Sequence, residues 1–157
     1  WGNFQEPVED GADNSGWYEM IGLQSSRHGP QSPIDVTYSD HVIAKGLSSW
    51  KTMNEELYNN VRVYDSANVV ASGRQMQMPR RKKNKPIDPD AKPTEAEAVV
   101  AWTNEFGPKK TRIFSTSLGH NNDTVGDDRY LMLICRGLLW STHKLTDSGE
   151  PAVGYGK

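Results

Sequence analysis

The residues of this chain best suited to chemistry are histidines, a glutamate and a tyrosine that lie far apart in the sequence. His120 follows an alternating segment at residues 111–117 and Gly119, which allows close approach of the backbone. A neutral imidazole can act as a general base, a general acid or a metal ligand near pH 7. We predict that His120 is catalytic; the alternative is that its ring bonds a backbone group and only fixes the loop.

Glu56 and Tyr58 lie two residues apart in the run Glu55-Glu56-Leu57-Tyr58. On an extended segment such residues point to the same side. A carboxylate beside a phenol suits proton transfer or the recognition of sugar hydroxyls. We therefore predict a catalytic role for Glu56 and a substrate-binding role for Tyr58. In the structural alternative, Glu56 accepts backbone N–H bonds as a loop staple and Tyr58 covers the core.

His28 lies in Arg27-His28-Gly29-Pro30, within a segment at 25–33 that its glycine and prolines mark as a loop. If this loop folds over the site, His28 would join His120 and Glu56 as a catalytic group. Two histidines and one carboxylate could also bind a divalent metal. No short-spacing motif such as His-x-x-x-His is present, so the metal and any other cofactor stay unknown.

Four further residues are predicted to contact a substrate. Asn121 and Asn122 carry amides that both donate and accept hydrogen bonds, as a polyol requires, although as turn residues they need no such role. Trp102 could stack on a sugar ring, with Thr103 beside it, but a tryptophan in an apolar strand is more commonly part of the core. Both alternatives stay open for each residue.

These side chains need a folded framework, and the hydrophobic pattern predicts one. A short helix is predicted at 16–24, strands at 34–38, around 61–63 and at 68–75, and a hairpin at 98–117. Asp127 and Asp128 open a last helix at the positive end of its dipole. Its predicted buried stripe consists of Tyr130, Leu131, Ile134, Leu138 and Leu139. Residues 78–97, rich in proline and charge, are predicted to form a mobile insertion between two strands.

The composition argues against several classes of function. The net charge of −2 gives no general attraction to nucleic acid or to an anionic membrane. The basic cluster at 80–85 lacks interleaved aromatic residues and is followed by acidic ones, so a solvated loop is favoured over nucleic-acid binding. No apolar run approaches the roughly 20 residues that a membrane-spanning helix needs. The single cysteine, Cys135, allows no internal disulfide, so the compartment stays unknown.

Four segments, taken in order, resemble the ThuA-like family, which is named for trehalose utilisation. They are His41–Leu47, Glu55–Asn60, Ala98–His120 and Arg129–Trp140, and the similarity covers residues 16–143. The resemblance implies an α/β fold like that of the class I glutamine amidotransferases, a flavodoxin-like layered sheet with helices on both faces. It also implies a domain of carbohydrate metabolism, which binds or acts on a sugar or keto-sugar at the C-terminal rim of the sheet. The reaction would be that of a sugar-modifying hydrolase, lyase or isomerase.

The resemblance also implies that the chain corresponds to only the second part of such a domain. Folds of this kind begin with strand–helix–strand units, which residues 1–16 cannot supply. We therefore expect a single partial domain over residues 1–157, a fragment whose sheet is completed by an N-terminal half or a partner chain. The alternative function is a non-catalytic carbohydrate-binding or assembly module. Cys135 is expected in mid-helix as a buried structural residue without a nucleophile elbow, so glutaminase activity is not predicted.

Overall fold

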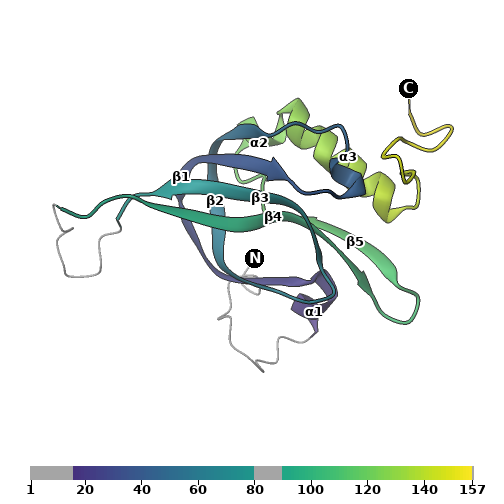
Figure 1. The fold of residues 1–157 in the computed structure, drawn as a ribbon, viewed down its shortest axis with the longest axis horizontal. Helices are drawn as coiled ribbons and strands as arrows, with labels where there is room; N and C mark the ends of the chain where they lie inside the picture. Colours follow the sequence, from purple (N-terminus) through teal and green to yellow (C-terminus); the bar gives the residue numbers. More distant parts are fainter. Residues whose placement is uncertain (1–15, 80–89, 157) are drawn as a thin grey trace.

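A curved five-stranded sheet forms the body of the protein in the computed structural model, which describes residues 16–79 and 90–156 (Figure 1). In the spatial order β2-β1-β3-β4-β5, its strands are β1 Leu23–Tyr38, β2 Trp50–Val63, β3 Asn68–Gln77, β4 Thr94–Phe106 and β5 Thr111–Thr116. The helices are α1 Trp17–Ile21, η2 Val42–Ala44, α2 Asn122–Val125 and α3 Asp128–Ser141. None of the helices in these ranges has the length and apolar character that a membrane span requires.

The expected combination of helices with a sheet is confirmed, but the strand directions differ from the flavodoxin-like arrangement. A flavodoxin-like sheet is largely parallel and lies between layers of helices, whereas each neighbouring pair of strands described here is antiparallel. Figure 1 shows the longest helix, α3, over one side of the sheet and only the five-residue α1 at the other. Because neighbouring strands run in opposite directions, their carboxyl ends do not meet at one rim.

The strand β1 is 16 residues long and includes the segment 25–33 that the sequence predicts as a loop. That prediction is wrong, and the reason is visible in the pairing of β1 with β2. The register shifts between His28 and Gln31 and again between Pro33 and Asp35. Such irregularities accommodate prolines, which have no N–H to give to the ladder of hydrogen bonds. The strand therefore continues through residues whose local preference is for a turn.

The boundaries of the later elements agree in part with the sequence predictions. The hairpin of β4 and β5 is confirmed, but β4 begins at Thr94 and pairs with β3 there, so the end of the predicted insertion at 78–97 is strand. Residues 80–89, which include the basic cluster and half of that insertion, lie outside the described residues. The helix α3 begins after Asp127, whose side chain caps it by accepting a hydrogen bond of 2.9 Å from the N–H of Arg129.

The orientation of α3 differs from the predicted one. Its buried residues are Leu133, Gly137 and Trp140. A Cβ on Gly137 would lie 2.3 Å from the ring of Phe114 on β5, so the lack of a side chain at Gly137 lets the helix pack closely against the sheet. Leu131 and Leu138, predicted to be buried, are 43% and 63% exposed. Cys135, also predicted to be buried, is exposed. The helix therefore presents apolar side chains on its outer surface.

The main core lies between the sheet and α3. Its completely buried members include Ile34, Val70, Val100 and Leu133. His41 lies at the edge of this core and caps η2, because its Nδ1 accepts a hydrogen bond of 3.1 Å from the N–H of Ile43. Burial lowers the pKa of His41, which favours the neutral ring that can accept this bond. His41 therefore has a structural role in the connection from β1 to β2.

Candidate functional site

Four of the predicted site residues lie together at the surface, although they come from three segments of the chain. Nδ1 of His28, Nδ1 of His120 and the hydroxyl of Tyr58 each lie 3.5 Å from Oε2 of Glu56. We call these four residues the histidine–glutamate cluster. At 3.5 Å the contacts are longer than a tight charge-assisted hydrogen bond of about 2.7–2.9 Å. One carboxylate oxygen thus faces three groups that can carry a proton, and a small movement would strengthen any one of the contacts.

The antiparallel pairing of β1 with β2 explains three of the four positions. His28 is directly opposite Tyr58, and Gln31 is directly opposite Glu56, and side chains of such cross-strand pairs are neighbours. The rings of His28 and Tyr58 have their centroids 5.4 Å apart. Glu56 and Tyr58 point to the same side of β2, as the sequence predicts for residues two apart on a strand. Strand register, rather than a strand end, brings these groups together.

The ring of His120 lies between Gln31 and Glu56. Nε2 of His120 is 2.8 Å from the amide nitrogen Nε2 of Gln31. An amide nitrogen can only donate, so the ring Nε2 is the acceptor. In a neutral ring the proton is then on Nδ1, which is the nitrogen that faces Glu56. This arrangement gives His120 a defined tautomer with its basic nitrogen held by a side-chain amide.

The loop that carries His120 is held by Glu55, a glutamate that is not among the predicted site residues. Both oxygens of Glu55 accept backbone hydrogen bonds of 3.1 Å, one from the N–H of His120 and one from that of Asn121. The preceding Gly119 has a φ of +107°, and a Cβ there would lie 2.7 Å from the hydroxyl of Tyr130. The role of accepting backbone N–H bonds from the loop, considered above for Glu56, thus belongs to Glu55. Its position two residues before a core leucine of the same strand is the sequence signal that could have revealed it.

The members of the cluster differ in their access to solvent. The side chain of Glu56 is 14% exposed, whereas those of His28 and His120 are 32% and 38% exposed. The carboxylate is therefore shielded and the imidazoles can be reached from outside. A site of this kind lets a ligand meet the rings while water has limited access to the charge that orients them.

A polar cavity of about 420 Å³ adjoins the cluster at His28. Its lining residues are Arg27, His28, Asn59, Asn60 and Gln77. Nδ2 of Asn59 donates a hydrogen bond of 3.2 Å to Oε1 of Gln77. Oδ1 of Asn59 is buried and has no hydrogen-bond partner among the residues that the structure describes. The cavity therefore offers amide and guanidinium groups of the kinds that bind hydroxyl-rich ligands.

The two asparagines after His120 occupy different environments. The side chain of Asn121 donates a hydrogen bond to the carbonyl of Asn54 on β2, which fastens the loop to the strand. Asn122 is exposed and is the first residue of α2. Asn121 thus contributes to the position of the loop, and the predicted substrate contacts of both residues stay predictions.

Trp102 and Thr103, which the sequence predicts to contact a sugar, both have their side chains in the interior. Trp102 is 1% exposed, packs in a small core with Tyr18, and donates a hydrogen bond of 2.7 Å from its Nε1 to the carbonyl of Ile21. Thr103 is also 1% exposed, and its hydroxyl lies 3.3 Å from Nε2 of His41. The tryptophan anchors α1 to β4 and presents no face to a ligand.

The sequence leaves open whether His28, Glu56 and His120 hold a metal. Across residues 16–79 and 90–156, no group of three or more His, Cys, Asp or Glu side chains is arranged to hold a metal ion. Nδ1 of His28 also lies 2.8 Å from the carbonyl oxygen of Gly29. This contact occupies the nitrogen that would otherwise be directed at a shared ion.

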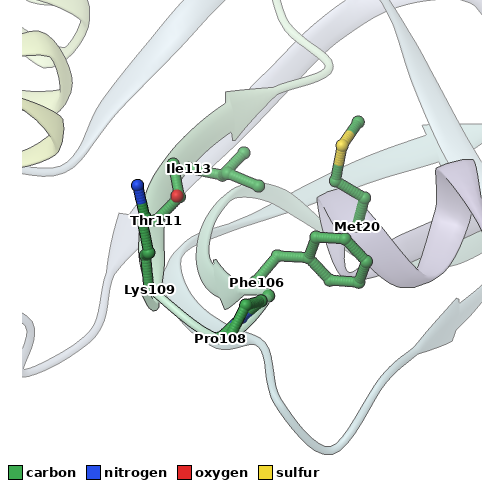
Figure 2. Close-up of a pocket in the computed structure, with 7 residues that line it drawn as sticks. Met20, Phe106, Pro108, Lys109, Thr111 and Ile113 are labelled. Atoms are coloured by element: carbon green, nitrogen blue, oxygen red, sulfur yellow. The ribbon is translucent and has the colours of Figure 1, made fainter.

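A second pocket, of about 320 Å³, lies at the opposite end of the β4–β5 hairpin from His120 (Figure 2). It is lined by Met20, Phe106, Gly107, Pro108, Lys109, Thr111 and Ile113. Thr111 pairs with Phe106 at this end of the hairpin, whereas Thr116, which leads to the His120 loop, pairs with Ala101 at the other. None of the predicted site residues lines this pocket, so it is separate from the histidine–glutamate cluster.

Together these features define an α/β domain in which one carboxylate faces two imidazoles beside a polar cavity. Comparison with protein families makes the assignment specific: the chain matches the model of the ThuA family, described as trehalose utilisation, over residues 8–141. The match covers most of the chain, and the protein belongs to the ThuA family. It is thus a domain of carbohydrate metabolism related to trehalose utilisation. No curated protein and no solved structure matches the chain significantly.

Proposed function

We propose that this ThuA domain acts on a sugar or keto-sugar by acid–base catalysis at the histidine–glutamate cluster. The observation that carries the proposal is the position of Oε2 of Glu56, 3.5 Å from Nδ1 of both His28 and His120. A carboxylate beside an imidazole orients the ring and stabilises its protonated form. The family assignment supports the substrate class, because trehalose utilisation is carbohydrate metabolism.

The proposed mechanism begins at Nε2 of His120, which accepts a hydrogen bond from Gln31. A sugar hydroxyl, or a C–H next to a keto group, would take the place of this amide and meet the same lone pair. His120 would remove the proton, and Glu56 would stabilise the imidazolium that forms. When the proton comes from the C–H, His28, in its protonated form on the other side of Glu56, would give a proton to the keto oxygen, and the product would be an enol. Tyr58 would hydrogen-bond the substrate beside them.

The polar cavity next to His28 is the proposed binding place for the remainder of the sugar. Its guanidinium and amides come from Arg27, Asn59, Asn60 and Gln77. Amides bind hydroxyl groups well because each can donate and accept, and Oδ1 of Asn59 is a buried acceptor for which the described residues supply no donor. This location replaces the C-terminal rim of a parallel sheet that the resemblance implies.

Sugar binding can be tested with ¹H–¹⁵N NMR spectra recorded as trehalose, or a keto derivative of it, is added. We expect saturable shifts of the amide signals of His28, Asn59 and Gln77. Asn59→Leu should remove these shifts, because leucine has a similar volume and no hydrogen-bonding group. Met20→Ala, in the separate apolar pocket, is the control and should bind as the wild type does. Shifts confined to the apolar pocket, or none at all in a folded protein, would refute the proposal.

The edge of the sheet at β5, opposite the β2 edge, favours a second candidate function. In this function the domain is a non-catalytic assembly module that completes its sheet with another chain. Within the described residues β5 pairs only with β4. A cavity of about 290 Å³ beside this edge is lined by Phe114, Thr116, Ile134, Leu138 and Ser141. An edge strand takes up an extended segment through its backbone groups, while apolar side chains fill neighbouring pockets. The proposed occupant is an apolar strand of another chain, which would also extend the sheet towards the layered amidotransferase-like form.

Sedimentation velocity tests this second candidate, with a second copy of the chain as the partner. We expect the wild type to self-associate and Leu138→Lys to be a monomer of unchanged thermal stability, because the side chain is 63% exposed and a lysine there can stay in water. Met76→Lys, at a 55% exposed position on the central strand β3, is the matched control and should associate as the wild type does. A wild-type protein that stays monomeric at its highest soluble concentration would contradict assembly with a second copy of the chain.

A further inference from the structure

Glu55 is completely buried although the segment around it is polar. Strict alternation along β2 from the buried Trp50 and Thr52 would turn Glu55 outward. The register shift between the pairs Pro33–Asn54 and Asp35–Lys51 places one additional residue in β2, which changes the phase of the alternation. As a result Glu55 points inward and Glu56 points to the histidine–glutamate cluster. The two adjacent carboxylates therefore lie on opposite sides of one strand.

Every oxygen of the Glu55 residue has a hydrogen-bond donor. Its two carboxylate oxygens accept from the N–H groups of His120 and Asn121, each at 3.1 Å. Its carbonyl accepts a bond of 3.0 Å from the buried amide of Gln75, which also donates to the carbonyl of Ser32 at 2.9 Å. A buried carboxylate is strongly unfavourable unless its oxygens are satisfied in this way. The strand position of Glu55 is thus fixed, and the loop is attached to it.

Two hydrogen bonds to consecutive N–H groups restrict the backbone on both sides of the His120 Cα. This restriction determines the direction in which the side chain leaves the loop. From that position the ring reaches Gln31 at 2.8 Å and Glu56 at 3.5 Å. Without the Glu55 carboxylate, the described contacts of this turn with β2 would be the side-chain bond from Asn121 to Asn54 and the 3.5 Å contact of the His120 ring with Glu56, neither of which holds the two backbone N–H groups.

We infer that Glu55 is a positioning residue, which places the imidazole of His120 against Glu56 by holding the backbone of the loop. The inference deepens the proposed function and rests on it for its catalytic importance. It also makes a distinction between neighbours: Glu56 contacts both imidazoles, whereas Glu55 holds the loop of only one of them. A change at Glu55 should therefore affect His120 and spare His28.

The test is an NMR comparison of two matched variants, Glu55→Gln and Glu56→Gln, in the intact chain without a sugar. In the wild type we expect a nuclear Overhauser contact between the His120 ring and the side-chain amide of Gln31. Glu55→Gln replaces one acceptor by an NH₂ group that opposes a backbone N–H. It should remove that contact and shift the Hε1 resonance of His120, leaving the Hε1 resonance of His28 in place. Glu56→Gln should shift both ring resonances.

The possible outcomes separate positioning from mere stabilisation. If folded Glu55→Gln leaves both ring signals unchanged, or moves them equally, the inference is wrong. If this variant does not fold, hydrogen exchange of the wild type decides, because the His120 and Asn121 amides should exchange at least about tenfold more slowly than an exposed loop amide. Fast exchange of both amides would equally overturn the inference. Since no sugar is added, failure of this test and failure of the proposed function are independent results.

Discussion

Glu56→Gln is expected to lower kcat on a keto-sugar by about 100-fold or more, the usual contribution of acid–base catalysis. The glutamine has nearly the same shape but no negative charge, so it cannot stabilise an imidazolium at His28 or His120. The contacts that it would weaken are those at 3.5 Å to the two Nδ1 atoms. Steady-state kinetics with a reducing-end or carbonyl assay measures the effect, and thermal unfolding shows whether the variant is folded.

A second glutamate provides the control for this experiment. Glu97 lies on β4, is 51% exposed and forms a surface ion pair of 3.1 Å with Arg74. Surface pairs of this kind contribute little, so Glu97→Gln should have the kcat and stability of the wild type. His120→Ala should reduce kcat about as much as Glu56→Gln, and the double variant should be little worse, because the groups act as a unit. Full activity of folded Glu56→Gln would remove the carboxylate from the mechanism.

Trp102→Ala is expected to have the largest effect on stability, a loss of about 3–5 kcal/mol in the free energy of unfolding. The side chain is 1% exposed, and its Nε1 donates to the carbonyl of Ile21 at 2.7 Å. The substitution leaves a cavity in the small core that joins α1 to the sheet, and it leaves that carbonyl without its donor. Urea denaturation followed by circular dichroism measures the change.

Trp17→Ala is the matched control for this measurement. Trp17 is in α1 as well, but it is 45% exposed, and its removal should change stability by no more than about 0.5 kcal/mol. The comparison separates burial from the mere presence of a tryptophan. If Trp102→Ala costs little stability and instead removes sugar binding, the sugar-stacking role predicted from the sequence would have to be restored.

The sequence correctly predicted the elements that depend on residues close together in the chain. The start of α3 at Asp127 and the turn between β4 and β5 follow from capping and turn residues. The continuity of β1 could not be predicted, because Gly29, Pro30 and Pro33 favour turns and the strand passes through them by shifting its register. The outward face of α3 was also mispredicted, since the close approach of Gly137 to Phe114 depends on tertiary packing.

Part of the candidate site was predictable, because the positions of some of its residues follow from residues close together in the chain. The rule for residues two apart on a strand placed Glu56 beside Tyr58, and the grouping of His28, His120 and Glu56 was considered from their chemistry alone. The role of Glu55 was not predictable in the same way, because its contacts connect residues 65 and 66 positions apart. Alternation from Leu57 turns Glu55 inward, whereas alternation from Trp50 and Thr52 turns it outward, so the local pattern alone does not decide its side.

The register of β1 against β2 has a consequence for changes in chain length. His28 meets Tyr58, and Gln31 meets Glu56, only in this frame, and sliding one strand by a single residue turns every side chain to the other face. Residues inserted at 45–49, after η2, would lengthen the connection and leave the pairing intact. A residue inserted into β2 between Glu56 and Tyr58 would turn these two side chains to opposite faces and separate the reacting groups while sparing each of them. In this protein such an insertion would be as damaging as the loss of a catalytic side chain.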